Sequence, residues 1–187
     1  MTNQKKYVAY VSTYTMGDNH GITIYDVDVE NGMFKERCEI EVDNSSYVIA
    51  SSDGKTLYSI ADEGVVSFRI LPNGSLARLN SSSIRGMRGC HLCTDEEDKY
   101  VFVSGYHDGK TTVLNLNPDG SVGKIVDGVF DRGYGSVAER NFRPHVTCTR
   151  RMPDNRFVLS VDNGIDQVKI YRFNDKEQKL VQVDAIR

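Results

Sequence analysis

Hydrophobic and polar residues alternate over short stretches of this chain, and Asn-Gly, Asp-Gly or Asp-Asn pairs interrupt these stretches. This pattern is typical of many short antiparallel β-strands joined by tight turns, and helical periodicity is almost absent. One clear unit contains four such strands, which we predict at residues 47–50, 56–60, 65–70 and 75–79. The chain is therefore expected to be all-β.

The four-stranded unit recurs along the chain. A basic residue just before the second strand of each unit marks the repeat, at Lys6, Lys55, Lys99 and Arg156. These marks are separated by 49, 44 and 57 residues. A repeat of about 40–50 residues with four antiparallel strands is typical of a β-propeller blade. We therefore predict that the chain consists of propeller blades, each a four-stranded meander.

The repeat places the blades within one partial propeller domain that covers residues 1–187. The predicted blades occupy approximately residues 1–43, 44–87, 88–142 and 143–187. The first blade is expected to lack its innermost strand, because residues 7–11 already follow the basic mark and so form a second strand. The longer third gap is interpreted as an insertion of roughly residues 123–143. The chain then contains about 3.75 blades, and we expect a missing C-terminal half or another chain to complete the ring.

Composition and charge narrow the classes of function. Hydrophobic residues make up 39% and charged residues 26%, which suits a packed core. The net charge is −3 and no basic block is present, so nucleic acid is not an expected partner. No apolar stretch suits a secretory signal or a membrane span. The four cysteines lack a complete zinc-binding spacing, so we expect reduced thiols, no metal and a cytoplasmic location.

The repeat also assigns the loops to the two faces of the expected disc. Successive strands run antiparallel, so the link into the first strand of a blade shares a face with the loop between its second and third strands. The tight Asp-Gly and Asn-Gly turns lie on the other face. The loops rich in polar and aromatic side chains therefore gather on one face, where a rigid scaffold tends to carry function.

His145 is the first candidate for a catalytic residue, since it leads into an innermost strand beside the expected central channel. A free imidazole titrates near ~6.5, so it can take a proton from water and return it to a leaving alkoxide. The alternative is a histidine satisfied by a neighbouring backbone carbonyl. Glu139 is a second catalytic candidate, as a base or an orienting partner. His91 occupies the equivalent point one blade earlier, where it either contacts a substrate or packs in the core.

Further candidates could bind a substrate. Arg140 and Arg143 lie at the end of the predicted insertion, and guanidinium groups suit carboxylate and phosphate oxygens, although these arginines could also be solvated. Tyr106 and His107 are expected to line the site. Asp162 either fixes its own loop through an Asx-type turn or reaches the site. No Gly-rich phosphate loop, nucleophile elbow or His-Glu-x-x-His helix is present, and no cofactor is expected.

Several segments in order resemble the lactonase family of seven-bladed β-propellers, which includes bacterial 6-phosphogluconolactonases and fungal carboxymuconate-lactonizing enzymes. The matching segments are residues 12–15, 21–25, 90–91, 101–106, 143–145, 153–156 and 162–168. The resemblance covers nearly the whole chain, which would form the N-terminal half of a family member. At Thr147 the chain departs from relatives that carry a second histidine, which argues against a mechanism with paired histidines.

The resemblance implies a ring of seven blades and an enzyme that hydrolyses a sugar lactone. The implied substrate is an anionic lactone or sugar phosphate similar to 6-phosphogluconolactone, in the pentose-phosphate branch of carbohydrate metabolism. An alternative is the reverse type of reaction, in which a muconate-type lactonizing isomerase closes the ring. A third alternative is a propeller that serves only as a binding platform, because a fold does not determine a function.

Overall fold

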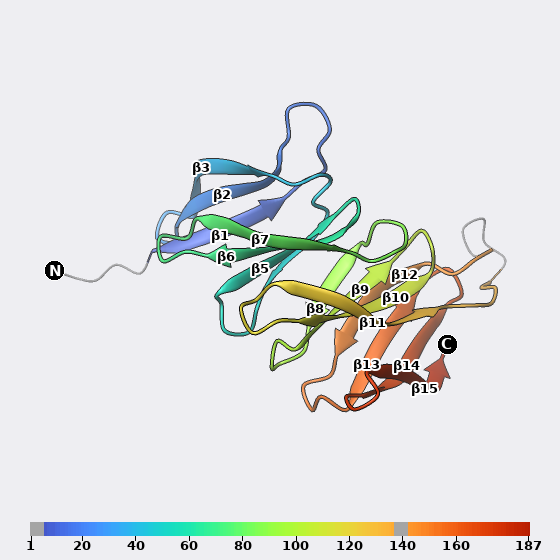
Figure 1. Ribbon diagram of the computed structural model, residues 1–187. Helices are drawn as coiled ribbons and strands as arrows, with labels where there is room; N and C mark the ends of the chain where they lie inside the picture. Colours follow the sequence, from blue (N-terminus) through green and yellow to red (C-terminus); the bar gives the residue numbers. More distant parts are fainter. Residues whose placement is uncertain (1–5, 137–141) are drawn as a thin grey trace.

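The computed structural model describes residues 6–136 and 142–187, and within them the chain forms four antiparallel sheets (Figure 1). The first sheet contains β1 (Tyr7–Ser12), β2 (Gly21–Asp28) and β3 (Met33–Glu41). The second contains β4 (Val48–Ala50), β5 (Thr56–Ala61), β6 (Gly64–Ile70) and β7 (Leu76–Ser83). The third contains β8 (His91–Thr94), β9 (Tyr100–Gly105), β10 (Lys110–Leu116) and β11 (Val122–Phe130). The fourth contains β12 (Val146–Arg151), β13 (Phe157–Asp162), β14 (Gln167–Asn174) and β15 (Lys179–Ile186).

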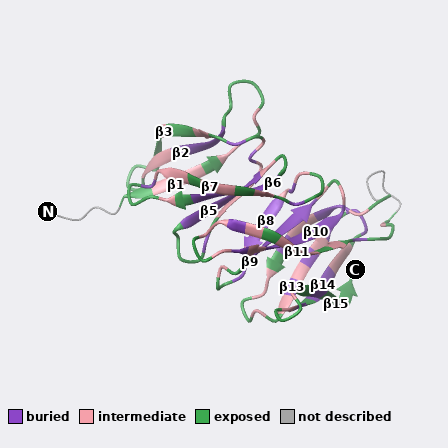
Figure 2. Ribbon diagram, in the orientation of Figure 1, coloured by how far each residue is buried: buried purple, intermediate pink, exposed green. Residues whose placement is uncertain are grey.

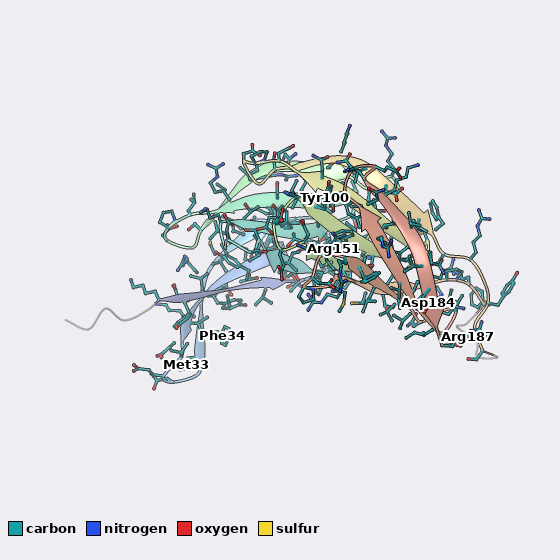
Figure 3. All side chains as sticks on the ribbon, turned by 90° about the horizontal axis from the view of Figure 1, so that it is seen from below. Met33, Phe34, Tyr100, Arg151, Asp184 and Arg187 are labelled. Atoms are coloured by element: carbon teal, nitrogen blue, oxygen red, sulfur yellow. The ribbon has the colours of Figure 1, made fainter. Side chains whose placement is uncertain are left out.

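Each sheet is a simple meander of the kind found in propeller blades. The strands of every sheet follow the order of the chain, and each strand pairs antiparallel with the next. The first sheet has three strands and begins at the position of a second strand, as the repeat predicts. Figure 3 shows the sheets from below as an arch, and Figure 1 shows them following one another in chain order. The prediction of propeller blades is therefore confirmed.

The predicted insertion at residues 123–143 is partly wrong. Most of its first half belongs to β11, the outermost strand of the third sheet, which pairs with β10 from Lys110↔Phe130 to Leu116↔Val122. Two register shifts interrupt this pairing near Leu114, so the apolar residues of β11 do not alternate regularly. Outermost strands are also half exposed and carry polar residues, so their alternation of hydrophobic and polar residues is weak. The connection between the third and fourth sheets therefore begins at Asp131, after β11 ends.

The hydrophobic core lies between consecutive sheets. The cluster between the third and fourth sheets includes Phe102 and Val113 from one side and Tyr171 and Phe173 from the other. Similar clusters join the first sheet to the second and the second to the third. Figure 2 shows the middle strands largely buried and the outermost strands β3 and β15 largely exposed. Each blade is thus stabilised mainly by the faces of its neighbours.

Buried hydroxyl groups add specific links between sheets. The Ser104 hydroxyl donates to Thr149 Oγ1 at 2.8 Å, and the hydroxyls of Thr111 and Ser160 lie 3.1 Å apart. Both pairs join the third sheet to the fourth at positions that the solvent does not reach. Because each hydroxyl has a partner, burying it carries little penalty. These pairs fix how the two sheets sit against each other.

The two faces of the arc differ as the repeat predicts. On one face the turns close on their own carboxylates and amides: the backbone N of Lys55 donates to Asp53, and that of Ser121 donates to Asp119. On the other face loops of neighbouring blades contact each other, for example Arg88, which donates to Asp62 Oδ1 at 2.9 Å. No helix of the described residues is long and apolar enough to cross a membrane.

Candidate active site on the loop-bearing face

His145 lies directly before the innermost strand β12, and contacts on three sides hold it. Its side chain and backbone are almost fully buried, with 5% of the residue exposed. The backbone N of His145 donates to Asp162 Oδ1 at 2.7 Å, and its carbonyl accepts from the backbone N of Asn163 at 3.1 Å. The imidazole stacks on the Tyr106 ring, with centroids 4.3 Å apart and planes inclined by 16°. The ring therefore has a fixed position and orientation.

The hydrogen bonds of the imidazole determine its tautomer. Nδ1 of His145 lies 2.8 Å from the carbonyl oxygen of Tyr106. A carbonyl oxygen can only accept, so Nδ1 carries the proton of the neutral ring and donates it. Nε2 then bears the lone pair, and no described residue contacts it through a hydrogen bond. A contact with a backbone carbonyl is also what a purely structural histidine would make. Here the Tyr106 carbonyl fixes the tautomer, so that Nε2 can accept a proton from a ligand.

Gly164 brings the loop that follows β13 into direct contact with the His145 backbone. A Cβ added at Gly164 would lie 2.0 Å from the carbonyl oxygen of Arg143 and 2.8 Å from both N and Cδ2 of His145. Only a residue without a side chain fits this position without a shift of its neighbours. The connection that ends in His145 and the β13–β14 loop therefore pack as one unit.

Asp162 holds the His145 backbone and the β13–β14 loop together. Besides the His145 backbone, its Oδ1 accepts from the backbone N of Gly164 at 2.9 Å and of Ile165 at 3.3 Å. The residue is 1% exposed. The Asx-type turn that the sequence suggests is present, and the same carboxylate also orients the catalytic candidate. A direct contact of Asp162 with substrate stays a prediction, and its burial does not favour it.

His91 is the first residue of β8 and is buried, slightly less completely than His145. It is 9% exposed, and its ring packs against Tyr47 with centroids 4.7 Å apart. Its Nε2 lies 3.7 Å from Cys148 Sγ, whereas Nδ1 is buried without a hydrogen-bond partner among the described residues. Burial lowers the pKa of His91, and the positive charge of Arg150 lowers it further. His91 is therefore a neutral, largely packed histidine, and its role in binding stays a prediction.

The remaining predicted residues take different places. Tyr106 covers His145, and the exposed His107 packs edge-on against Tyr106 with ring centroids 5.4 Å apart. Arg143 is exposed, with its guanidinium over the Phe142 ring at 5.7 Å from the centroid. It is thus available to an anionic ligand. Glu139 and Arg140 lie outside the described residues, so their roles stay predictions.

Three contacts on this face were not predicted from the sequence. Tyr47 packs on His91, Cys148 contacts its Nε2, and Arg88 lies 2.9 Å from Asp62 Oδ1. Tyr47 directly precedes the innermost strand β4 and Cys148 lies within the innermost strand β12, so a comparison of corresponding positions in each blade would have identified them. Arg88 offered no such signal, because it lies in a link of irregular length.

A large cavity lies elsewhere. It has a volume of about 740 Å³ and lies among the tight turns of the second and third sheets, on the opposite face. Its lining includes Asp53, Asp98 and Asp119 but none of the predicted site residues. Cavity size alone does not identify chemistry, whereas His145 combines a defined tautomer with a free nitrogen. The loop-bearing face is therefore the better candidate site.

Comparisons with known proteins agree with this architecture. The family model described as "Lactonase, 7-bladed beta-propeller" matches residues 8–187. The 6-phosphogluconolactonase of Bacillus subtilis is 33% identical over 176 residues, which are 91% of this chain and 50% of that protein. A crystal structure from Bacteroides fragilis superposes with a TM-score of 0.90 at 30% identity, covering 100% of this chain and 56% of the other. The periplasmic gluconolactonase of Pseudomonas aeruginosa superposes with a TM-score of 0.87 at 25% identity, covering 94% of this chain and 53% of the other. The chain spans about half the length of these relatives.

Proposed function

Because the chain belongs to the lactonase family of seven-bladed β-propellers, we propose that the complete protein hydrolyses the ring ester of a sugar lactone. The observation that carries this proposal is the state of His145. Its Nδ1 is engaged by the Tyr106 carbonyl, and its Nε2 is left without a partner among the described residues. A fixed imidazole with a free lone pair is what general-base activation of water requires.

The proposed reaction proceeds in two proton transfers. His145 Nε2 accepts a proton from a water molecule while the water oxygen bonds to the lactone carbonyl carbon. The bond from this carbon to the ring oxygen then breaks, and the imidazolium returns the proton to the departing alkoxide, giving the open hydroxy acid. The stacked Tyr106 ring and the Asp162 contact keep the imidazole in place throughout.

We propose an anionic substrate similar to 6-phosphogluconolactone. The exposed guanidinium of Arg143 lies two residues before His145, so it can bind a phosphate or carboxylate at the mouth of the site. Glu139 and Arg140 are proposed to act in the same connection. The 6-phosphogluconolactonase of Bacillus subtilis, which is 33% identical over the matched half, supports this substrate class. A cytoplasmic location, expected from the sequence, remains part of the proposal.

The test replaces His145 in the complete protein. We expect His145→Ala to lower kcat for 6-phosphogluconolactone by about 10²–10⁴-fold, the usual contribution of a general base, with little change in Tm. His20→Ala is the matched control, since His20 is an exposed histidine whose Nε2 lies 3.5 Å from Glu39. The control should keep the full rate. Unchanged turnover in His145→Ala would reject the proposed base.

The choice of substrates separates the alternatives. Turnover of 6-phosphogluconolactone above that of unphosphorylated gluconolactone supports the anionic substrate. Ring closure of a carboxymuconate, without lactone hydrolysis, would instead indicate a lactonizing isomerase. Absence of both reactions, together with capture of a protein by the loop-bearing face, would indicate a binding platform.

A further inference from the structure

A buried polar cluster lies behind His145, where the third sheet meets the fourth. Asp131 directly follows β11, and its backbone N donates to the carbonyl of Gly109 at 2.8 Å. Its side chain is fully buried. Asp131 Oδ1 lies 2.9 Å from Lys169 Nζ and accepts from the Tyr171 hydroxyl at 3.2 Å. Oδ2 of Asp131, in contrast, is buried without a hydrogen-bond partner among the described residues.

Asp162 has the same imbalance between its two oxygens. Its Oδ1 accepts three backbone N–H groups, from His145, Gly164 and Ile165. Its Oδ2 is buried and, within the described part of the chain, has no donor. Each of the two carboxyl groups therefore has one oxygen fully engaged and one without a donor. A buried acceptor without a donor costs about 1–3 kcal/mol, so two side by side need an explanation.

One proton between the two carboxyl groups explains both oxygens. Burial raises the pKa of Asp131, the hydrogen bond from Lys169 opposes the rise, and the neighbouring Asp162 carboxyl group raises this pKa further. Two carboxyl groups can form a hydrogen bond only if one of them is protonated. A single shared proton also makes the cluster neutral, because it leaves one negative charge opposite the Lys169 ammonium. Among the described residues, the charged or titratable groups that face Asp131 are Asp162 from β13 and Lys169 and Tyr171 from β14.

We propose that Asp131 is a positioning residue for His145, acting through a proton that it shares with Asp162. Asp131 begins the connection between the third and fourth sheets, and His145 ends it. The carboxyl pair thus ties both ends of this connection to the same point, and Asp162 passes the constraint to the backbone N of His145. The catalytic consequence rests on the proposed function, whereas the positioning itself does not.

The first test measures positioning without any substrate. In the complete protein, the backbone amides of His145 and Gly164 both donate to Asp162 Oδ1. Their NMR signals should shift together as Asp131 titrates, above the usual aspartate range. Gly164 has no side chain to titrate, so its shift cannot arise from its own ionisation. In Asp131→Asn the chemical shifts of these backbone N–H groups should keep their low-pH values over the whole titration, because the introduced side-chain amide donates to Asp162 at every pH. Amides that titrate identically in both proteins would overturn the proposal.

The second test measures catalysis. Asp131→Ala removes the donor to Asp162 and should lower kcat about 10–100-fold, in line with a misplacement of up to 1 Å, with little effect on KM. Asp131→Asn should stay within about threefold of the wild-type kcat. Asp127→Ala is the matched control, since Asp127 Oδ2 also ties the two sheets, through the backbone N of Leu180 at 2.7 Å. The control should keep the wild-type kcat and the His145 amide signal.

The outcomes separate the two proposals. Loss of activity in Asp131→Asn equal to that in Asp131→Ala would overturn the shared proton. If His145→Ala is fully active, the proposed function fails, yet the amide titrations still decide whether Asp131 positions His145. If Asp131→Ala does not fold, the comparison of wild type with Asp131→Asn decides alone.

Discussion

Substitution of Gly164 tests how strictly His145 depends on the loop that packs against it. In Gly164→Ala the new Cβ would lie 2.0 Å from the Arg143 carbonyl oxygen, whereas Cβ atoms essentially never approach other atoms closer than 3.0 Å. The two backbones must therefore separate by about 1 Å. The same Cβ would lie 2.8 Å from the backbone N of His145, so His145 has to move as well.

A shift of this size should be visible in the kinetics. Misplacement of a catalytic group by about 1 Å costs roughly 100-fold in rate, which corresponds to about 2.7 kcal/mol of activation free energy. The overpacking should also lower the free energy of unfolding by about 1–3 kcal/mol. The assay is lactone turnover by the complete protein at saturating substrate, together with thermal unfolding.

Gly128→Ala is the control for this substitution. Its Cβ would meet Cε of Lys110 at 3.0 Å, so this side chain has to shift by only a few tenths of an ångström. We expect wild-type kcat and a small change in Tm. Wild-type turnover and stability in Gly164→Ala would refute the reasoning, because they would show that the contact yields without moving His145.

Two further predictions concern the core and the thiols. Phe102 belongs to the cluster between the third and fourth sheets, and Phe102→Ala should lower the free energy of unfolding by about 3–5 kcal/mol. Phe130 is 56% exposed, and Phe130→Ala should change the free energy of unfolding by no more than about 0.5 kcal/mol. Equal losses for the two variants in urea unfolding would contradict the assigned core. Cys93 should resist iodoacetamide at pH 8 in the native protein, because burial raises its pKa to about 12, and should react after unfolding. Peptide mass mapping with the exposed Cys38 as reference checks this, and native labelling of Cys93 as fast as Cys38 would disprove it.

The sequence predicts the inner strands well and misses one outermost strand, β11, for one physical reason. Inner strands such as β9 and β5 are buried on both faces and are rich in apolar residues. The outermost strand β11 is half exposed and has two register shifts, so neither period nor composition reveals it. This is why residues 123–130 were predicted to be an insertion rather than a strand.

The repeat predicts which loops share a face, but not which buried side chains pair between blades. Tyr106, His145 and Asp162 meet because the links into first strands and the loops after second strands lie on the same face. Asp131 was missed, although β14 contains a signal for it: Lys169 shares the buried side of the strand with Tyr171. A lysine on a buried strand face needs a hydrogen-bonding or charged partner, and the identity of this partner becomes clear only when the sheets are assembled.

The charged residues of the Asp131–Asp162–Lys169 cluster are better explained by a role in the candidate site than by a gain in stability. Most of the other buried contacts between the described sheets are apolar side chains or neutral hydroxyl pairs, which pack at little cost. A buried ion pair with a second carboxyl group is rarely more stable than apolar residues of the same volume. The Asp131–Asp162–Lys169 cluster departs from this pattern where Asp162 accepts from the backbone N of His145. Natural sequences depart from apolar packing mainly at functional sites, so the location of the cluster supports the proposed role of His145.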